Sequence, residues 1–333
     1  MMGTSTAVSP DGRWIAFEVF RAVYPPGTQV WWSGLGMLDT ANGATRRIPT
    51  PEGRSHSRPI FHPDGTHVFC LWGRAGRWKR AVCRIDLATG EQRDLYGLDS
   101  SLPDPPIDYL SGFGVAPDGK SLLVSRSDAV VRWPLHDLRL VEFERNTVRV
   151  GLPAHEGARY FGDIHFLSDT DVLLTAGARF GMAVAAEIAA LGLTSVNTLL
   201  LRLRLGGIPR ILVPELERHP NSPNDNGGLR RIGLARDGTL VATAQRGRPG
   251  PGVSNQIAEV DVDRQQLRYI TTLQGIKDGV SLAADGSRVA FMSDESMSRS
   301  RTSELWSLDR RSGSVVRHNL LPRLQADPKF FLP

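Results

Sequence analysis

The sequence predicts an all-β protein, a six-bladed β-propeller of four-stranded antiparallel blades with one helical insertion in blade four. Three observations lead to this fold class. A short turn motif ahead of an apolar run occurs six times in the 333 residues, five times with an Asp-Gly pair. A second alternating segment follows most copies, and the repeating units carry no regular helical pattern. A period of about 50 residues with these features is typical of β-propellers.

The first copy of the motif, SPDGRWIAF, begins at Ser9. The other copies begin at His62, Ala116, Leu167, Ala235 and Ala283, and the copy at Leu167 is degenerate. The spacings between the turn aspartates are 53, 54, 51, 68 and 48 residues (Asp11, Asp64, Asp118, Asp169, Asp237 and Asp285). Asp-Gly tolerates the positive φ that a primed two-residue hairpin turn requires, and proline ahead of it fixes the approach of the chain. We therefore expect each copy to form the inner hairpin of one blade.

A second signature follows four of the copies and reads as two alternating strands joined by a Gly, Asn or Asp turn. It begins at Met37, Val82, Ile257 and Leu305. Two hairpins supply the four strands of a blade. The predicted blades cover residues 4–49, 56–97, 110–151, 160–213, 229–273 and 277–320, and a tail covers 321–333. We expect one domain that closes without a shared strand, by side-chain packing between blades one and six.

The SPDG turn before an apolar strand resembles the TolB-type propeller repeat, and the resemblance covers nearly the whole chain. The resemblance implies a propeller fold. Propellers of this kind include partner-binding modules, enzymes and the lid domains of prolyl oligopeptidases, so the fold leaves the function open. The sequence contains no G-x-S-x-G elbow, so we expect no hydrolase domain of the last group.

Composition and charge narrow the classes of partner. The chain carries 40 basic and 35 acidic residues, for a net charge of +5, and the basic residues are scattered. Scattered charge does not favour nucleic-acid binding. The first twenty residues lack a secretory signal pattern, and the best apolar run, residues 182–193, is too short to span a bilayer. We expect a cytoplasmic protein with no nucleic-acid or membrane partner.

Two cysteines are placed to face each other in blade two. If the strands of residues 68–71 and 81–85 pair, Cys70 lies opposite Cys83, and we expect two reduced buried thiols rather than a disulfide. His62 and His67 flank the inner turn of the same blade and are interpreted as capping or solvated residues. The sequence lacks the paired spacings of known zinc motifs, so we expect no cofactor, with a metal ion as the less favoured alternative.

The elaborated segments fall between the second and third strands and between blades, away from the inner turns. The largest is in blade four, at residues 178–197, where GMAVAAEIAALGL (181–193) favours a helix that Gly192 ends. An apolar helix must bury one face. Over the channel mouth it would be a lid, and against another chain a dimer contact, so we leave monomer and dimer open.

Positions counted back from each turn aspartate predict which side chains face the channel. At minus five and minus three the residues are mostly apolar, and we expect them to pack between blades, as with Phe113, Ile164, Ile232 and Val280. By the period-two rule, minus six and minus four face the channel. Asp163 and His165 share that face, with Arg58 and Arg231 at the height of Asp163. The predicted substrate-binding residues around them are Arg58, Arg231, His56, Tyr109, Lys277 and Asp278.

This arrangement favours acid/base chemistry in the central funnel. An aspartate that orients a histidine holds its pKa near neutrality, as general acid or base catalysis requires, so Asp163 and His165 are the predicted catalytic pair. The two arginines suit a carboxylate or phosphate. We expect a lyase, cyclase or hydrolase acting on a small polar or anionic substrate. The alternatives are a structural ion-pair network and a noncatalytic scaffold that binds a protein or peptide on the elaborated loop face.

Overall fold

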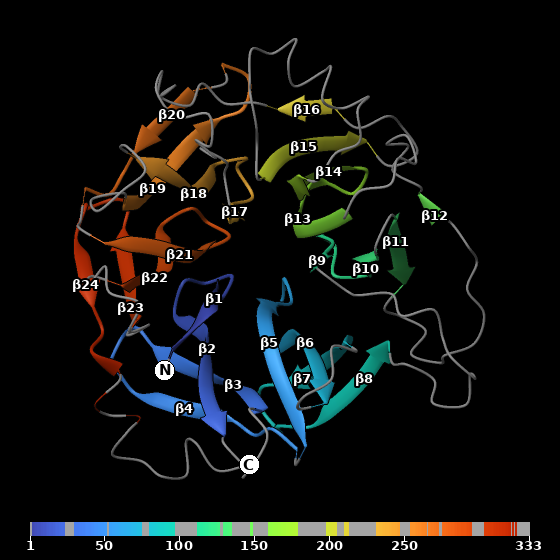
Figure 1. Cartoon of the computed structure of the whole chain (residues 1–333), viewed down its shortest axis with the longest axis vertical. Coiled ribbons are helices and arrows are strands. Elements are labelled where there is room, and N and C mark those ends of the chain that lie inside the picture. Colours follow the sequence, from blue (N-terminus) through green and yellow to red (C-terminus); the bar gives the residue numbers. More distant parts are fainter. Residues whose placement is uncertain are drawn as a thin grey trace. The chain divides into compact units, whose positions relative to one another are not determined.

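The computed structural model describes residues 2–23, 30–51, 53–74, 80–96, 112–126, 129–134, 147–148, 159–178, 198–204, 210–212, 231–246, 254–264, 266–272, 275–294, 303–320, 322 and 324. Within these ranges the chain forms six sheets, each of four consecutive strands (Figure 1). Neighbouring strands pair antiparallel, as β1 with β2 and β5 with β6 do. The chain is therefore an all-β protein built from repeated four-stranded sheets.

The first two sheets consist of β1 (Met2–Val8), β2 (Trp14–Val23), β3 (Val30–Asp39), β4 (Thr45–Ile48), and of β5 (Arg54–Phe61), β6 (His67–Arg74), β7 (Arg80–Asp86), β8 (Gln92–Tyr96). The next two consist of β9 (Gly112–Val115), β10 (Ser121–Arg126), β11 (Ala129–Pro134), β12 (Thr147–Val148), and of β13 (Arg159–Ser168), β14 (Asp171–Ala178), β15 (Thr198–Arg204), β16 (Arg210–Leu212). The last two consist of β17 (Ile232–Leu234), β18 (Leu240–Arg246), β19 (Ser254–Asp261), β20 (Gln266–Tyr269), and of β21 (Ile276–Leu282), β22 (Arg288–Asp294), β23 (Glu304–Asp309), β24 (Val315–Arg317).

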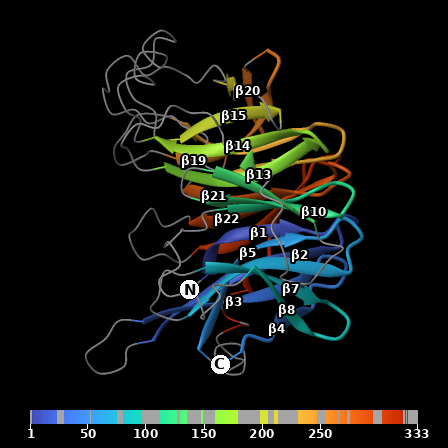
Figure 2. The same ribbon diagram turned by 90° about the vertical axis from the view of Figure 1, so that its right-hand side faces the viewer.

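The sheets group into two compact units. The first unit comprises residues 1–110, 138–140 and 278–333, and it holds the sheets β1–β4 and β5–β8 with nearly all of β21–β24. The second comprises residues 111–137 and 141–277 and holds the sheets β9–β12, β13–β16 and β17–β20. In the first unit, β1 and β2 lie beside β5 (Figures 1 and 2).

The inner turns differ in type from the primed two-residue turn that the Asp-Gly pairs predicted. The Gly12 N–H donates to the Ser9 carbonyl at 2.9 Å, and Gly12 has a φ of 71°. Asp11 is not among the described non-glycine residues with positive φ. The turn is therefore type I, followed by a left-handed glycine, which suits Pro10 because its fixed φ favours the second position of that turn. Gly65, Gly119, Gly238 and Gly286 repeat both features.

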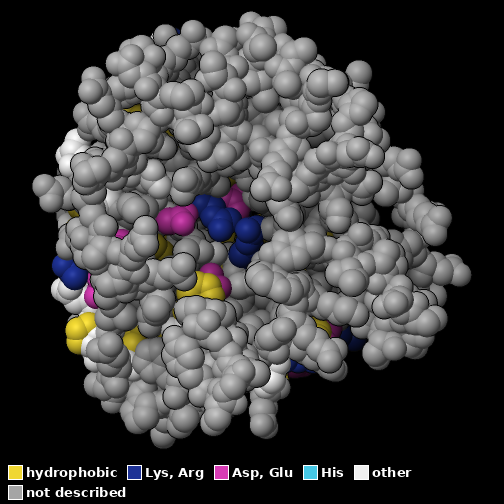
Figure 3. Space-filling model, in the orientation of Figure 1, with side chains coloured by type: hydrophobic (Ala, Val, Ile, Leu, Met, Phe, Trp, Pro, Cys, Tyr) yellow, Lys and Arg dark blue, Asp and Glu magenta, His cyan; other side chains and the backbone are white. Residues whose placement is uncertain are grey.

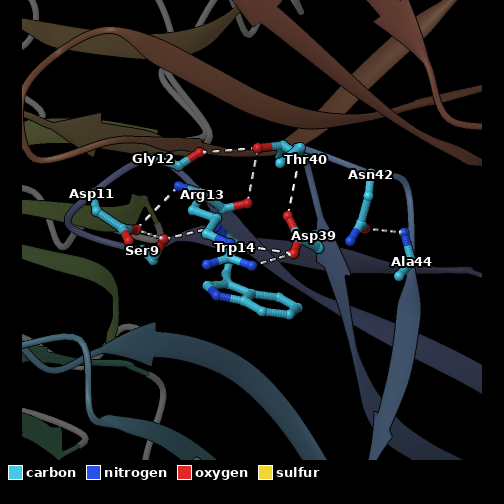
Figure 4. Close-up of polar contacts among 10 residues, drawn as sticks. Ser9, Asp11, Gly12, Arg13, Trp14, Asp39, Thr40, Asn42 and Ala44 are labelled. Carbon is cyan, nitrogen blue, oxygen red and sulfur yellow. Dashed lines mark hydrogen bonds and ion pairs between the residues drawn. The ribbon is translucent and has the colours of Figure 1, made fainter.

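The turn aspartate has a second role, which Figure 4 shows for the first sheet. Asp11 Oδ1 accepts the Arg13 N–H at 3.0 Å. The aspartates of the other four Asp-Gly copies accept the N–H two residues further on in the same way. Such a local side-chain acceptor stabilises a turn against the extended alternatives. The turn thus requires the aspartate because its carboxylate oxygen accepts this hydrogen bond. It requires the glycine because glycine readily adopts a positive φ.

The outer hairpins are present as predicted. Between β3 and β4, Asp39 N–H donates to the Ala44 carbonyl at 2.8 Å, and Asp39 Oδ1 accepts the Ala41 N–H at 2.9 Å. Arg13 also donates to Asp39 at 2.8 Å, which ties the inner turn of this sheet to its outer turn. β7–β8, β19–β20 and β23–β24 form the corresponding hairpins elsewhere.

The core lies between sheets. In the second unit, Leu173 and Leu200 of one sheet share a buried cluster with Ile232 and Ala258 of the next, so minus-five residues pack between sheets as expected. The other minus-five residues named above, Phe113, Ile164 and Val280, are buried as well.

The first and last sheets of the chain meet inside the first unit. Phe17 and Val19 of β2 share a buried cluster with Met292 of β22 and Leu305 of β23. Leu320 and Leu324, just beyond β24, complete this cluster. Each of the two sheets is built from its own four strands, so no strand is shared. Their contact combines side-chain packing with hydrogen bonds of Thr6 Oγ1 in β1 to the Gly279 carbonyl and to Ser281 Oγ in β21.

Several predictions concern residues outside the described ranges. These are the helix at 181–193 with nearly all of the predicted insertion at 178–197, most of the tail at 321–333, and Tyr109. Ala178, at the edge of the predicted insertion, is the last residue of β14. Among the described residues, no helix has the length and apolar character needed to cross a membrane.

Candidate functional site

Two of the predicted site residues in the second unit form an ion pair. Asp163 lies in β13 and Arg231 immediately precedes β17. Arg231 Nη1 donates to Asp163 Oδ1 at 3.0 Å, and the Ile232 N–H donates to Asp163 Oδ2 at 3.3 Å. Both carboxylate oxygens therefore accept hydrogen bonds from the start of β17, and Asp163 links two neighbouring inner strands.

Two buried threonines accept hydrogen bonds from the backbone N–H groups of the two residues of this ion pair. Thr175 Oγ1 accepts the Asp163 N–H at 2.8 Å, and Thr243 Oγ1 accepts the Arg231 N–H at 3.1 Å. Each threonine stands six residues after its turn aspartate, in β14 and β18 respectively. In both sheets a threonine hydroxyl thus accepts a backbone N–H hydrogen bond near the end of the inner strand. The repeated threonine is a sequence signal that our prediction missed.

His165 lies two residues beyond Asp163 on β13 and is half-buried. Burial lowers the pKa of His165 below its usual value, although the Asp163 charge and a hydrogen bond to the backbone of Ile232 act in the opposite direction. The imidazole is therefore neutral at neutral pH. A neutral imidazole keeps one acceptor nitrogen, which is what a general base or a hydrogen-bond acceptor for a ligand requires.

Arg58, in the first unit, has a strained backbone. It lies at a bulge of β5 between Ser57 and Ile60, and its φ is 52°. Gly279 occupies the same repeat position, six residues before its turn aspartate, and has a φ of 62°. In these two sheets the position has a left-handed backbone, which glycine adopts readily and arginine does not, whereas Asp163 and Arg231 at the same repeat position do not have a positive φ. The Arg58 side chain is partly exposed.

Asp278 is the other predicted residue of the first unit with access to solvent. Its side chain is half-buried, and its Oδ1 accepts the Gly279 N–H at 2.8 Å. The carboxylate thus caps the left-handed glycine that follows it.

Full burial argues against substrate contact by His56 and Lys277, which both have 0% exposure. Lys277 Nζ donates to the Gly275 carbonyl at 3.3 Å. Our placement of His56 assumed an unbroken two-residue alternation, and the bulge of β5 adds a residue between His56 and the inner turn. An added residue turns the preceding side chains to the other face of the strand. Burial lowers the His56 pKa to about 4, with a smaller contribution from Arg54.

The histidines at the inner turn of the second sheet act as the predicted caps. His62 Nδ1 accepts the Asp64 N–H at 3.3 Å and lies 2.7 Å from Asp64 Oδ1. His67 Nε2 lies 3.5 Å from Asp86 Oδ2. The contact of His67 with Asp86 connects the inner turn of the sheet to its outer turn.

In Figure 3, basic and acidic side chains of the described residues both reach the surface.

No family model and no curated protein matches the sequence. Solved structures do match its fold. TolB from Acinetobacter baumannii has a TM-score of 0.55 at 12% identity, over 94% of this chain and 62% of that one. The β-propeller domain of the Trilobed protease from Pyrococcus furiosus, described as having an open velcro topology, has a TM-score of 0.55 at 13% identity, over 95% and 97%. A puromycin-hydrolyzing peptidase of Mycobacterium tuberculosis has a TM-score of 0.53 at 15% identity, over 95% and 52%.

At these identities the likeness defines the fold, which is that of a TolB-like β-propeller, as the sequence resemblance indicated. The chain spans about 62% of the TolB structure and 52% of the peptidase, whereas it covers nearly all of the isolated propeller domain. The similarity is therefore to a propeller, and function has to be argued from the residues of this chain.

Proposed function

We propose that this chain is a six-bladed β-propeller that binds a polypeptide segment through residues at the ends of its inner strands. The observation that carries the proposal is the backbone of Arg58. A non-glycine residue with positive φ costs about 1–2 kcal/mol. The equivalent position in the last sheet has glycine, so the fold itself does not need an arginine there. Strain of this kind persists where the side chain has a use, and a partly exposed guanidinium is suited to bind a ligand.

The charge arrangement favours a peptide over a small anion. A receptor for a small anion needs cations that are not already neutralised, and Arg231 is paired with Asp163 in the same unit. Acidic and basic groups occur together at these positions, with the neutral imidazole of His165 beside them. A peptide presents carboxylate, amide and carbonyl groups that such a mixed surface can bind. Solved structures of similar fold include TolB and the propeller domain of a protease. This similarity is a further reason to propose a polypeptide as the ligand of this chain.

Six blades are the number that the sheets favour. The described residues contain six four-stranded sheets, and the first and last of them pack together through Phe17, Met292 and Leu305.

The test uses short synthetic peptides of random sequence as the probe. The pool is passed over the immobilised wild-type protein, Arg58→Ala and Arg268→Ala, and retained peptides are identified by mass spectrometry. Arg268 is an exposed arginine of the outer strand β20 whose partner is Glu259, so it controls for general charge. We expect the wild type and Arg268→Ala to retain the same subset, and Arg58→Ala to bind it at least about tenfold more weakly, as for a lost charged hydrogen bond. Retention that is equal in all three proteins contradicts the proposal.

A second candidate function is acid/base catalysis, and the observation that favours it is the neutral, half-buried imidazole of His165 beside Asp163. A neutral imidazole can accept a proton from water or a hydroxyl. Its probe is p-nitrophenyl acetate, an ester that imidazole bases hydrolyse. We expect a turnover rate that falls in His165→Gln and is retained in His62→Gln. Equal rates in the wild type and His165→Gln argue against this candidate.

A further inference from the structure

Three potential metal ligands come together inside the second sheet. They lie on three neighbouring strands, His56 on β5, Cys70 on β6 and Cys83 on β7. One ring nitrogen of His56 and the two Sγ atoms all lie within 4.8 Å of one another. All three residues have 0% exposure. The cluster belongs entirely to the first unit and is separate from the residues of the proposed peptide site.

The strand register explains why these residues meet. Cys70 and Cys83 are direct partners in the β6–β7 pairing, as the sequence predicted. His56 is the partner of Trp72, which lies two residues from Cys70 and hence on the same face of the sheet. The bulge between Ser57 and Ile60 is what turns His56 to this face. No sequence motif marks the site, because each ligand comes from a different strand.

The His56 ring contains a buried polar atom without a partner. Its Nδ1 lies 3.4 Å from Thr50 Oγ1, whereas Nε2 makes no hydrogen bond within the described part of the chain. Buried polar atoms nearly always have a partner, so an exception calls for an explanation such as a missing ion. The apolar residues of the surrounding cluster include Met37 and Val68. A histidine at this place has no evident packing role that an apolar residue could not fill.

The electrostatic surroundings favour a cation. Glu18 is 2% exposed and pairs with Leu35, a member of the same buried cluster, so its side chain lies on the face of β2 toward that cluster. A buried carboxylate carries a negative charge that a cation bound nearby would offset.

We propose that His56, Cys70 and Cys83 bind one zinc ion. Thiolate sulfur and imidazole nitrogen are the ligands that zinc takes in structural sites, at about 2.3 Å and 2.0–2.1 Å. Binding replaces the two S–H protons, which pass to solvent, by one divalent cation, so the buried complex of two thiolates and a neutral imidazole carries no net charge. Contraction of the three donors around one ion requires small changes of side-chain torsion. The fourth tetrahedral position remains for a further donor.

The test measures zinc on the purified full chain. Protein freed of metal with a chelator is incubated with Zn²⁺, separated from free metal by gel filtration and analysed for bound zinc. We expect one zinc per chain in the wild type and less than one tenth of that in Cys70→Ala, Cys83→Ala and His56→Leu. His67→Gln is the matched control, because His62, Asp64 and His67 form a second, partly exposed cluster that could take up zinc at the surface. It should retain the full stoichiometry.

A second measurement uses the wild type alone and does not depend on the folding of any variant. Co²⁺ added to the metal-free wild type should produce a thiolate-to-cobalt charge-transfer band and the intense visible bands of a tetrahedral site, and Zn²⁺ should abolish both. A chelator should lower the melting temperature of the zinc-loaded protein. Three results overturn the proposal: zinc uptake that is lost in His67→Gln alone, a cobalt spectrum without the thiolate band, or a Cys70–Cys83 disulfide in freshly purified protein.

Discussion

Arg58 carries a backbone φ of 52° at a position where the last sheet has Gly279 with a φ of 62°. The two residues perform the same backbone task, and only Arg58 adds a side chain to it. A substitution by glycine therefore separates the needs of the fold from those of the side chain.

We predict that Arg58→Gly leaves the fold at least as stable as the wild type while peptide retention falls. Relief of the left-handed strain is worth about 1–2 kcal/mol, and the added freedom of glycine in the unfolded chain costs about 0.4–1 kcal/mol. The net change in the free energy of unfolding should lie between about zero and a gain of about 1.6 kcal/mol, measured by urea denaturation. A loss of stability larger than the strain term would show that Arg58 is a structural residue.

The second residue-scale prediction concerns the pH dependence that His165 contributes. Its pKa in the folded protein lies below the ordinary value of 6.5, so the unfolded chain takes up the proton first as the pH falls. The contribution of the neutral ring is therefore fully present above about pH 6.5 and is lost as the pH falls through the lowered folded value. Urea denaturation at about pH 7.5 and about pH 5.5 should show a smaller difference for His165→Gln than for the wild type. An unchanged difference would contradict this assignment, and His56 remains in both proteins as an internal control.

At the scale of the element, the inner strand shows how far the sequence could predict the structure. The two-residue alternation correctly predicted burial for Phe113, Ile164, Ile232 and Val280 and brought Asp163 and Arg231 to one level. It failed for His56, because a bulge is a backbone irregularity that composition does not reveal. The alternation also could not show that both carboxylate oxygens of Asp163 accept hydrogen bonds from the start of β17, because that contact joins strands far apart in sequence.

Gly114 illustrates a sheet-to-sheet contact that the sequence pattern had assigned to the channel. A Cβ on Gly114 would lie 2.4 Å from the carbonyl oxygen of Ile164. The small residue thus allows β9 to approach β13 within the second unit. Its size is explained by this close packing, and the period-two pattern alone cannot distinguish the two reasons.

We predict that Gly114→Ala lowers the free energy of unfolding by about 1–3 kcal/mol, because the backbone of β13 must move. Gly90→Ala is the matched comparison. Gly90 has a φ of 75° and no atom within 4 Å of an added Cβ, so its substitution costs only conformational strain. Asparagine tolerates the left-handed region, so Gly90→Asn should be milder than Gly90→Ala, whereas Gly114→Asn should be worse than Gly114→Ala. Urea denaturation of the four variants checks this, and the same order at both positions would contradict the steric explanation.

At the scale of the whole molecule, the repeat period carried most of the fold prediction. Each repeat encodes its own two hairpins through local turn chemistry, such as the Asp11–Arg13 hydrogen bond, so the six sheets could be placed from sequence. The contact between the first and last sheets arises from Phe17 and Met292, which are far apart in sequence, and no local pattern contains it. We could expect that packing from the topology, but we could not name the residues that provide it.

The last prediction concerns how the two ends of the chain are held together in the first unit. Leu320 and Leu324 are buried at 0% and 1% exposure among Phe17 of the first sheet and Leu305 of the last. Replacement of a buried leucine by alanine costs about 2–5 kcal/mol, so Leu320→Ala and Leu324→Ala should each destabilise the protein by that amount in urea denaturation. Val316→Ala is the control near the same end of the chain, because Val316 is 46% exposed, and its effect should stay within about 0.5 kcal/mol.

The location of the change distinguishes this explanation from general destabilisation. Because the cluster joins β1 and β2 to β22 and β23, hydrogen exchange in Leu320→Ala should speed up first in those strands, while β14 and β18 of the second unit keep their protection. The native state would then open locally between the first and last sheets before it unfolds globally. Exchange that rises equally in β14 and β18 would mean that the terminal leucines support the whole chain, and the contact between the chain ends would not be an independent element of its stability.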